Sequence, residues 1–309
     1  MARRSISSIV VVKGDDADAL TDANDATTRE ISSMPDTMAQ RIKAGDVQLQ
    51  VRTDGREGPW VILAHALGAN LTLWDDVARH LASRYRVLRF DLRGHGGSDA
   101  PVGAYTMTRL ADDVVALMDA LDIGQAHFCG VSVGGMVGQT LGVRHADRLL
   151  SLTLMDTIHH TPLDAHPMWA NRIGQVEAHG MAGIIPTTLE RWLTPPFRDS
   201  HPEVVEKISE MLRATPVYGY VGVAQAVIAF DLADAIGRIH CPTLVVVGAN
   251  DEGAPVSMAR SIAEKIHGAR LEVLPDAAHL SFIEQPERFH AIFDAFLGHA
   301  ACGGQCDVP

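Results

Sequence analysis

The chain has 309 residues, of which 47% are hydrophobic and 5% aromatic, and this is the composition of a globular protein with one large domain or a domain with an insertion. Its formal net charge of −12 argues against nucleic acid as a partner, because an acidic chain repels phosphate backbones. No apolar run is long enough to cross a membrane, and the run IVVV near the amino terminus is too short for a secretory signal.

The four cysteines indicate a reducing, cytoplasmic setting. Cys129 and Cys241 lie in apolar runs and are expected to be buried free thiols. Cys302 and Cys306 lie in a glycine-rich tail, and two thiols do not close a zinc site.

The chain begins with an expected disordered tail, residues 1–37, because residues 14–36 hold six Asp, one Glu and one Arg and little to bury. The segments AQRIKA and VQLQVRTDG on either side of Gly45-Asp46 then predict a hairpin. After it, short apolar strands alternate with amphipathic helices. Strands are expected at 60–67, 85–94, 126–132 and 149–157, and helices at 71–83, 107–123 and 134–149.

The alternation stops at residue 158, and residues 158–236 show helical patterns and a group of large aromatic side chains that includes Trp169, Trp192, Phe197, Tyr218 and Tyr220. It resumes with strands at 242–250 and 269–277 and helices at 255–266 and 285–297. Strands that are apolar on both faces and separated by helices predict an α/β protein with a mostly parallel eight-stranded sheet covered on both faces. The expected division is a core at 38–157 and 237–298, a helical cap at 158–236 over the carboxyl ends of the strands, and a flexible tail at 299–309.

The stretch FCGVSVGGM (128–136) surrounds Ser132 with glycine where a predicted strand passes into a predicted helix. A turn this sharp strains the serine backbone, and side chains two positions before and after it would collide with the neighbouring strand and helix. Gly130 and Gly134 meet that demand, and the amino end of the following helix favours negative charge beside Ser132. The pattern predicts a nucleophilic serine, and a helix-capping serine is the alternative.

Two further residues follow strands in the order that a serine nucleophile needs. Asp251 lies just past a predicted strand and before Pro255, and His279 lies in the loop after the last strand. We expect His279 to take the Ser132 proton, and Asp251 to orient the imidazole and stabilise its cation. Asp156, at the end of the preceding strand, is the alternative acid. Activity is expected to rise with pH near a pKa of about 6.5, as His279 loses its proton.

The tetrahedral intermediate of such a reaction needs two preset hydrogen-bond donors for its oxyanion. The first candidate is the backbone N–H of Val133, the residue after the nucleophile. The second is the N–H of Leu67 in the loop AHALGAN (64–70), where Gly68 leaves room for a substrate to approach.

These residues resemble the α/β-hydrolase family, and the resemblance covers roughly residues 38–297. The motifs that carry it are DLRGHGGSD (91–99), GANDEGAP (248–255) and AAHLSFIEQPERF (277–289). Within the family the chain looks most like the 3-oxoadipate enol-lactonases, on the stretches LGANLTLWD (67–75), VEAHGM (176–181), LERWLTPPFR (189–198) and LRATPVYGY (212–220). The resemblance implies a cofactor-free enzyme that opens a small lactone with water. One departure is His65-Ala66, where many members have His-Gly.

An enol-lactone of this kind carries a free carboxylate, and a net-acidic protein needs a local cation to hold it. Four arginines of the expected cap have aromatic or apolar neighbours: Arg172, Arg191, Arg198 and Arg213. A planar guanidinium can hold a carboxylate with two hydrogen bonds. We expect Arg191, beside Trp192, to bind the substrate, with Trp169 and Tyr218 as further binding residues. The alternative for each arginine is a solvated charge on a helix surface.

Other functions stay open at this point. A general carboxylesterase, or a carbon–carbon bond hydrolase acting on products of aromatic ring cleavage, would use the same fold and triad. A non-catalytic ligand-sensing protein on a hydrolase scaffold is an alternative of another class. A metal-dependent lactonase is the last, since HHTPLDAH (159–166) is rich in histidine, but Pro162 breaks the single helix face that a metal site there would need.

Overall fold

The computed structural model describes residues 39–301, so the expected tail at 1–37 and residues 302–309 lie outside it. Eight strands form one sheet in the order β1-β2-β4-β3-β5-β6-β7-β8. The strands are β1 (Gln40–Ala44), β2 (Val47–Asp54), β3 (Trp60–Ala64), β4 (Arg86–Phe90), β5 (Ala126–Val131), β6 (Leu149–Met155), β7 (Thr243–Gly248) and β8 (Arg270–Leu274). β2 pairs antiparallel with β1 and β4, and every other pairing in the sheet is parallel.

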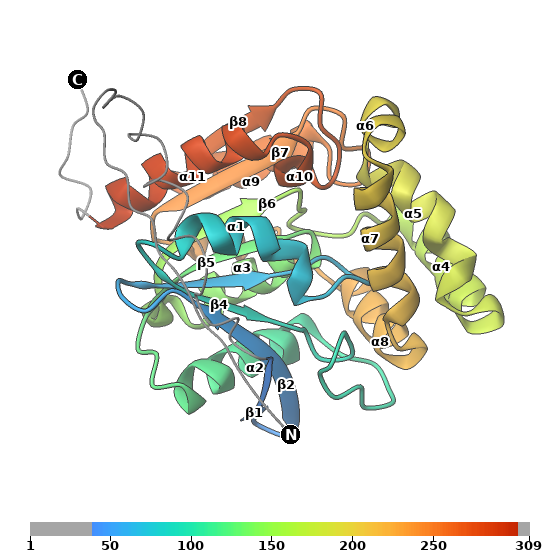
Figure 1. Cartoon of the computed structure of the whole chain (residues 1–309), viewed down its shortest axis with the longest axis horizontal. Coiled ribbons are helices and arrows are strands. Elements are labelled where there is room, and N and C mark those ends of the chain that lie inside the picture. The colour runs from blue at the N-terminus through green and yellow to red at the C-terminus, as the bar shows by residue number, and fades with distance from the viewer. Residues whose placement is uncertain (1–38, 302–309) are drawn as a thin grey trace, which may run out of the picture. The chain divides into compact units, whose positions relative to one another are not determined.

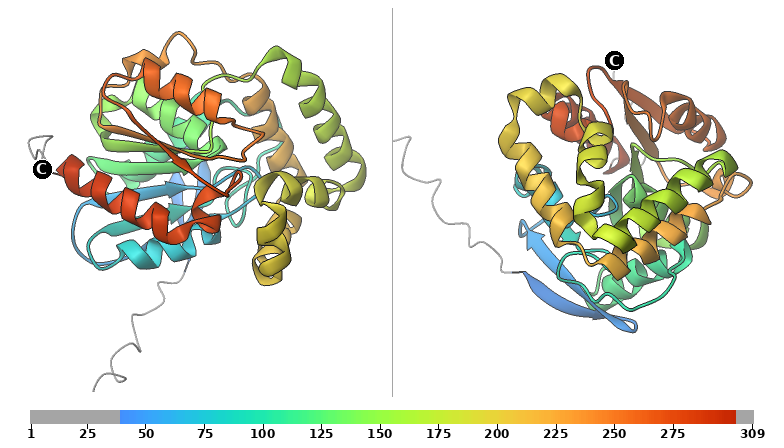
Figure 2. Two further views of the ribbon diagram at one scale, coloured as in Figure 1. Left: turned by 90° about the horizontal axis from the view of Figure 1, so that it is seen from above. Right: turned by 90° about the vertical axis from the view of Figure 1, so that its right-hand side faces the viewer.

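Helices cover both faces of the sheet, as its apolar strands require (Figure 1). All residues of β5 and of β7 are buried, because these central strands are packed on both sides. Figure 2 shows α1 (Asp75–Leu81) and α11 (Pro286–Ala301) on one face and α3 (Val133–Arg144) and α9 (Val256–Lys265) on the other. The helix α2 (Met107–Ala120) packs against α3 on the second face. The predicted fold class is confirmed, and α11 continues through residues 299–301, which the sequence assigned to the C-terminal tail.

The helical insertion follows β6, as predicted, and lies at the carboxyl ends of the strands (Figure 1). Its helices are α4 (His166–His179), α5 (Ile185–Trp192), α6 (Pro195–Ser200), α7 (Pro202–Ala214) and α8 (Val217–Ile228). An isolated antiparallel bridge between His160 and Asp231 joins the segments that enter and leave it. We call α4–α8 the cap. The domain boundaries expected from the sequence stay predictions, and no helix in residues 39–301 is long and apolar enough to span a membrane.

Candidate active site

Ser132 lies in the turn between β5 and α3, with backbone angles φ 56° and ψ −117°. A positive φ is strained for a residue with a side chain and persists only where the surroundings enforce it. A Cβ atom on Gly130 would lie 2.2 Å from the carbonyl oxygen of Gly134, and one on Gly134 would lie 2.3 Å from that of Ala64. The two glycines therefore let α3 pack close to β5 and β3, as the sequence predicts. This packing places Ser132 at the carboxyl end of the sheet.

Asp251 and His279 meet at the same end of the sheet, from the loops after β7 and β8. The Nδ1 atom of His279 lies 2.7 Å from Oδ2 of Asp251. The other oxygen of Asp251 accepts the N–H groups of Gly253 at 2.8 Å and Ala254 at 3.0 Å. These bonds fix the carboxylate, and the carboxylate in turn fixes the imidazole with Nδ1 as its donor.

Asp251 and His279 shift each other's pKa. Burial alone would raise the pKa of Asp251, but the charge of His279 and their hydrogen bond outweigh it, and the pKa is lowered. Burial alone would lower the pKa of His279, but the charge and hydrogen bond of Asp251 raise it above its ordinary value of 6.5. The sequence-based expectation of a value near 6.5 is therefore too low, because it omits the buried partner.

Asp156, the alternative acid, is fully buried and makes other contacts. Its Oδ1 accepts the N–H of Gly248 at 2.8 Å, and its Oδ2 accepts the hydroxyl of Ser281 at 2.7 Å. Burial and the nearby charge of Asp251 raise the pKa of Asp156 to about 8. Of the two aspartates, only Asp251 hydrogen-bonds to the ring of His279.

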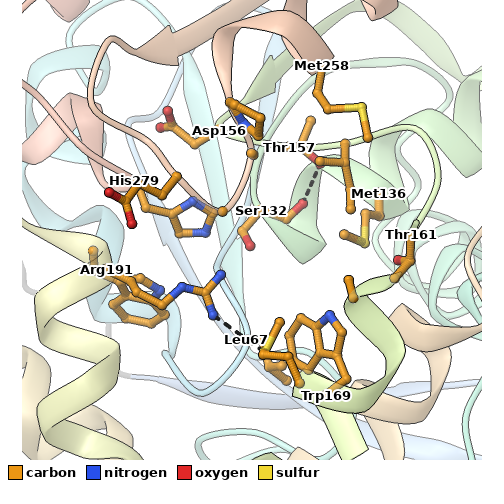
Figure 3. A pocket seen from close by; sticks show the side chains of 18 of the residues that line it. Leu67, Ser132, Met136, Asp156, Thr157, Thr161, Trp169, Arg191, Met258 and His279 are labelled. Carbon is orange, nitrogen blue, oxygen red and sulfur yellow. Dashed lines mark hydrogen bonds between the residues drawn. The ribbon is translucent and has the colours of Figure 1, made fainter. Parts of the chain in front are cut away.

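Ser132 and His279 line one cavity of about 310 Å³ between the sheet and the cap, a size at the lower end of small-molecule pockets. In Figure 3 the His279 ring lies next to Ser132, and Arg191 points into the same space near Trp169. Among the described residues Ser132 Oγ makes no hydrogen bond. The hydrogen bond between a nucleophile and its base is often long or absent without substrate, and it tightens only when substrate binds.

The loop that contains Leu67 is held from behind by two buried histidines. Nε2 of His95 accepts the N–H of Gly68 at 2.9 Å, and Nε2 of His65 accepts the N–H of Leu92 at 3.0 Å. Burial lowers the pKa of His65 to about 3 and that of His95 to about 4, so both are neutral acceptors at physiological pH. Leu67 itself lines the cavity, and Val133 follows Ser132 as the first residue of α3.

Two of the four arginines expected to be candidates line the cavity, namely Arg172 and Arg191. Arg172 donates to the hydroxyl of Tyr220 at 2.5 Å and to that of Thr188, both neutral groups. The contact of Arg191 is a long one, from Nη1 to the sulfur of Met168 at 3.9 Å. Burial and the charge of Arg172 lower the pKa of Arg191. Within residues 39–301 no carboxylate lies within ion-pair distance of either guanidinium.

Comparison with known proteins identifies the family of this chain. The family model described as the alpha/beta hydrolase fold matches residues 59–286. The chain belongs to the α/β-hydrolase family. It is 35% identical to 3-oxoadipate enol-lactonase 2 of Acinetobacter baylyi, over 83% of this chain and 95% of that protein.

Two solved structures of other α/β-hydrolases extend the likeness. The enol-lactonase from Burkholderia xenovorans has 35% identity and a TM-score of 0.81, over 84% of this chain and 100% of that one. A thermophilic esterase from Thermogutta terrifontis has 30% identity and a TM-score of 0.80, over 85% and 99%. The predicted resemblance is confirmed, as is the assignment to the hydrolases of esters and lactones.

Other residues of this α/β-hydrolase lie elsewhere than the sequence suggested. Tyr218 does not line the cavity, and 63% of its surface is exposed. Tyr220 lines the cavity instead, because residues two apart on a helix point about 200° apart. Arg198 and Arg213 also lie outside the cavity, whereas Trp169 and Trp192 line it as expected.

The histidine-rich segment after β6 does not gather into a metal centre. His159 contacts the hydroxyl of Ser261 through Nε2 at 3.4 Å, and its ring meets that of His160 edge-on. In the part of the chain that the structure describes, no three His, Cys, Asp or Glu side chains are placed to hold one metal ion.

Several site residues were missed by sequence reasoning. Tyr220 and Thr188 orient Arg172, His95 supports the Leu67 loop, and Met136, Met168 and Met258 supply apolar lining. Only His95 had a signal, since it lies in the DLRGHGGSD motif. The others are apolar or hydroxyl residues. Tyr220, Thr188 and Met168 lie on cap helices and reach the cavity because the cap folds back over the sheet, whereas Met136 and Met258 lie on α3 and α9.

Proposed function

We propose that this α/β-hydrolase opens a small lactone that bears a carboxylate, in the manner of 3-oxoadipate enol-lactone hydrolysis. The observation that carries the proposal is the cavity, where Ser132 and His279 share one small space with two arginines that have no carboxylate partner among the described residues. Half-buried cations with no carboxylate within ion-pair distance favour an anionic ligand, because the ligand offsets their partial desolvation.

In this mechanism Ser132 Oγ attacks the lactone carbonyl while Nε2 of His279 takes its proton. Asp251, bonded to Nδ1, stabilises the imidazolium that forms. Collapse of the tetrahedral intermediate breaks the ring C–O bond, and His279 returns the proton to the departing oxygen. A water molecule, deprotonated by His279, then attacks the acyl-enzyme and releases the second carboxylate with free Ser132.

The negative oxygen of the intermediate would be held by the N–H groups of Val133 and Leu67. Two observations support this assignment: Val133 is the first residue of α3, where N–H groups and the helix dipole favour negative charge, and Leu67 lines the cavity. The bond from Gly68 to His95 would keep the Leu67 loop in place during the reaction.

Arg191 is the first choice for the substrate carboxylate. Arg172 already donates to Tyr220 and Thr188, whereas within the described residues the hydrogen bonding of Arg191 is limited to a weak contact with the sulfur of Met168. The flat rings of Trp169 and Trp192, which also line the cavity, would enclose the lactone ring.

The test compares an unsaturated five-membered lactone bearing a carboxymethyl group with its neutral methyl ester and with simple aryl esters. We expect Arg191→Ala to lower kcat/KM for the carboxylated lactone by about 10- to 100-fold, the scale of one charge-assisted hydrogen bond, and to leave the neutral substrates nearly unchanged.

Arg213→Ala is the matched control, because Arg213 is exposed, pairs with Glu206 at 3.6 Å and lies outside the cavity. Ser132→Ala should abolish turnover of every substrate. If Arg172→Ala and Arg191→Ala treat charged and neutral substrates alike, the carboxylated lactone is the wrong substrate class, and a carboxylesterase for uncharged esters replaces it.

A further inference from the structure

One buried carboxylate joins the cap to the loop that carries His279. Oε2 of Glu284 accepts both the N–H of Thr194 at 2.9 Å and its hydroxyl at 2.6 Å. Oε1 of the same carboxylate accepts the N–H of Ala278 at 2.6 Å. Thr194 follows the end of α5, and Ala278 immediately precedes His279. The side chain of Glu284 therefore spans two segments that are far apart in the sequence.

A second link lies on the other side of His279. The N–H of Leu280 donates to the carbonyl oxygen of Trp192 at 3.0 Å. The rings of Trp192 and His279 are stacked, with centroids 6.3 Å apart. Both chain neighbours of His279 are thus bonded, directly or through Glu284, to the cap segment 192–194.

We propose that Glu284 is a positioning residue that couples the place of the cap segment 192–194 to the alignment of His279 with Ser132. The inference deepens the proposed function, since it takes His279 as the base that activates Ser132. Arg191 adjoins this segment, so a substrate held there would act on the imidazole through the same link.

A carboxylate suits this link because it only accepts hydrogen bonds, and three donors converge on it. In the described part of the chain no cation forms an ion pair with Glu284. The three hydrogen-bond donors therefore offset the cost of burying its carboxylate. A glutamine would turn its NH₂ group toward one of the N–H donors. That would separate either Ala278 or Thr194 from the side chain while keeping its volume.

The experiment measures how fast a small neutral fluorophosphonate labels Ser132 in the full chain, normalised to folded protein. This reaction needs His279 as base but no carboxylate recognition. We expect labelling to slow by about 10- to 100-fold in Glu284→Gln, since small misplacements of a catalytic group have effects of that order. Thr194→Val, which removes only the hydroxyl donor on the cap side, should also slow labelling, and the double variant should be no slower than Glu284→Gln.

Asp113→Asn is the matched control, because Asp113 is a buried carboxylate that accepts two bonds from Arg93 and lies outside the cavity. It should lower the melting temperature and leave labelling unchanged. If Thr194→Val and Glu284→Gln also lose only melting temperature, the coupling is overturned. If Glu284→Gln does not fold, Thr194→Val alone decides. A wild-type protein whose Ser132 is not labelled overturns the proposed function, and the coupling with it.

Discussion

Replacing Asp251 by asparagine should damage the enzyme far more than the same change at Asp156. One oxygen of Asp251 accepts the N–H groups of Gly253 and Ala254, and the other faces Nδ1 of His279. In an asparagine the carbonyl oxygen has to stay with the two N–H donors, so the NH₂ group points at the imidazole. The ring then carries its proton on Nε2, where it cannot accept the Ser132 proton.

The expected magnitudes differ by orders of magnitude. A wrong imidazole tautomer in an intact Ser-His-Asp site lowers kcat by ~10⁴-fold, so we expect a loss near that size in Asp251→Asn. Burial and the charge of Asp251 raise the pKa of Asp156 and favour its protonated form, and an amide resembles that form in shape and charge. The hydroxyl of Ser281 can turn to accept from the new NH₂ group, and the loss is then confined to the long bond of 3.3 Å from the N–H of Ser281. Asp156→Asn should therefore lose less than about 10-fold, the scale of one neutral hydrogen bond.

The assay is kcat and KM for an aryl ester and for the carboxylated lactone, with thermal melting to confirm folding. Equal losses in the two variants, or a larger loss at Asp156, would refute the reasoning and move the acid to Asp156.

The pH dependence of the melting temperature gives an independent check. Because the folded-state pKa of Asp156 is raised from 3.8 to about 8, the native state binds the proton more tightly, and this group removes stability as pH rises through that window. Asp156→Asn should gain melting temperature relative to wild type as the pH is raised from about 5 to about 8.

Two further results are expected. The kcat/KM of the wild type should fall as the pH drops through an apparent pKa above 6.5, because Asp251 raises the pKa of His279, and a midpoint below 6.5 would contradict this assignment. Gly130→Ala should lose about 1–3 kcal/mol of unfolding free energy and most of the activity, because its methyl group would meet the carbonyl of Gly134. Gly174→Ala on the open surface of α4 should instead gain about 0.5–1 kcal/mol in thermal or urea unfolding, and equal losses in both glycine variants would discount the packing argument.

The parts of the site that the sequence predicted are those that depend on local chain geometry. The turn at Ser132 needs glycine two residues before and after it, and the sequence has Gly130 and Gly134 at these positions. Asp251 was identified as a loop residue after a strand, and its neighbours Gly253 and Ala254 are the ones that hold its carboxylate. Parallel strands bring such loops to one end of the sheet, so order along the chain translates into proximity.

The missed residues of the cap depend on the phase and tertiary position of its helices. α8 has the sequence VYGYVGVAQAVI, in which nearly every residue is apolar, so no polar face indicates which tyrosine points inward. Tyr220 rather than Tyr218 faces the cavity because α8 packs against α4, which carries Arg172. Selecting Arg172 and Arg191 from four similar arginines required the same tertiary information.

Asp156 and Asp251, two buried aspartates in the loops after neighbouring strands, differ in their contacts and in the pKa of their carboxyl groups. Two ionised carboxylates in one buried region repel, and this repulsion together with burial favours the protonated form of one of them. The hydrogen bond to the imidazole decides which one. Asp251 is bonded to the cation that forms on His279, so its pKa falls. At Asp156, burial and the charge of Asp251 outweigh the charge of His279 and the contacts with Ser281 and Gly248, so its pKa rises. A protonated Asp156 still ties the His279 loop to β7 through these two contacts. In the proposed mechanism, the negative charge that the reaction needs is thereby confined to Asp251, the carboxylate in contact with His279.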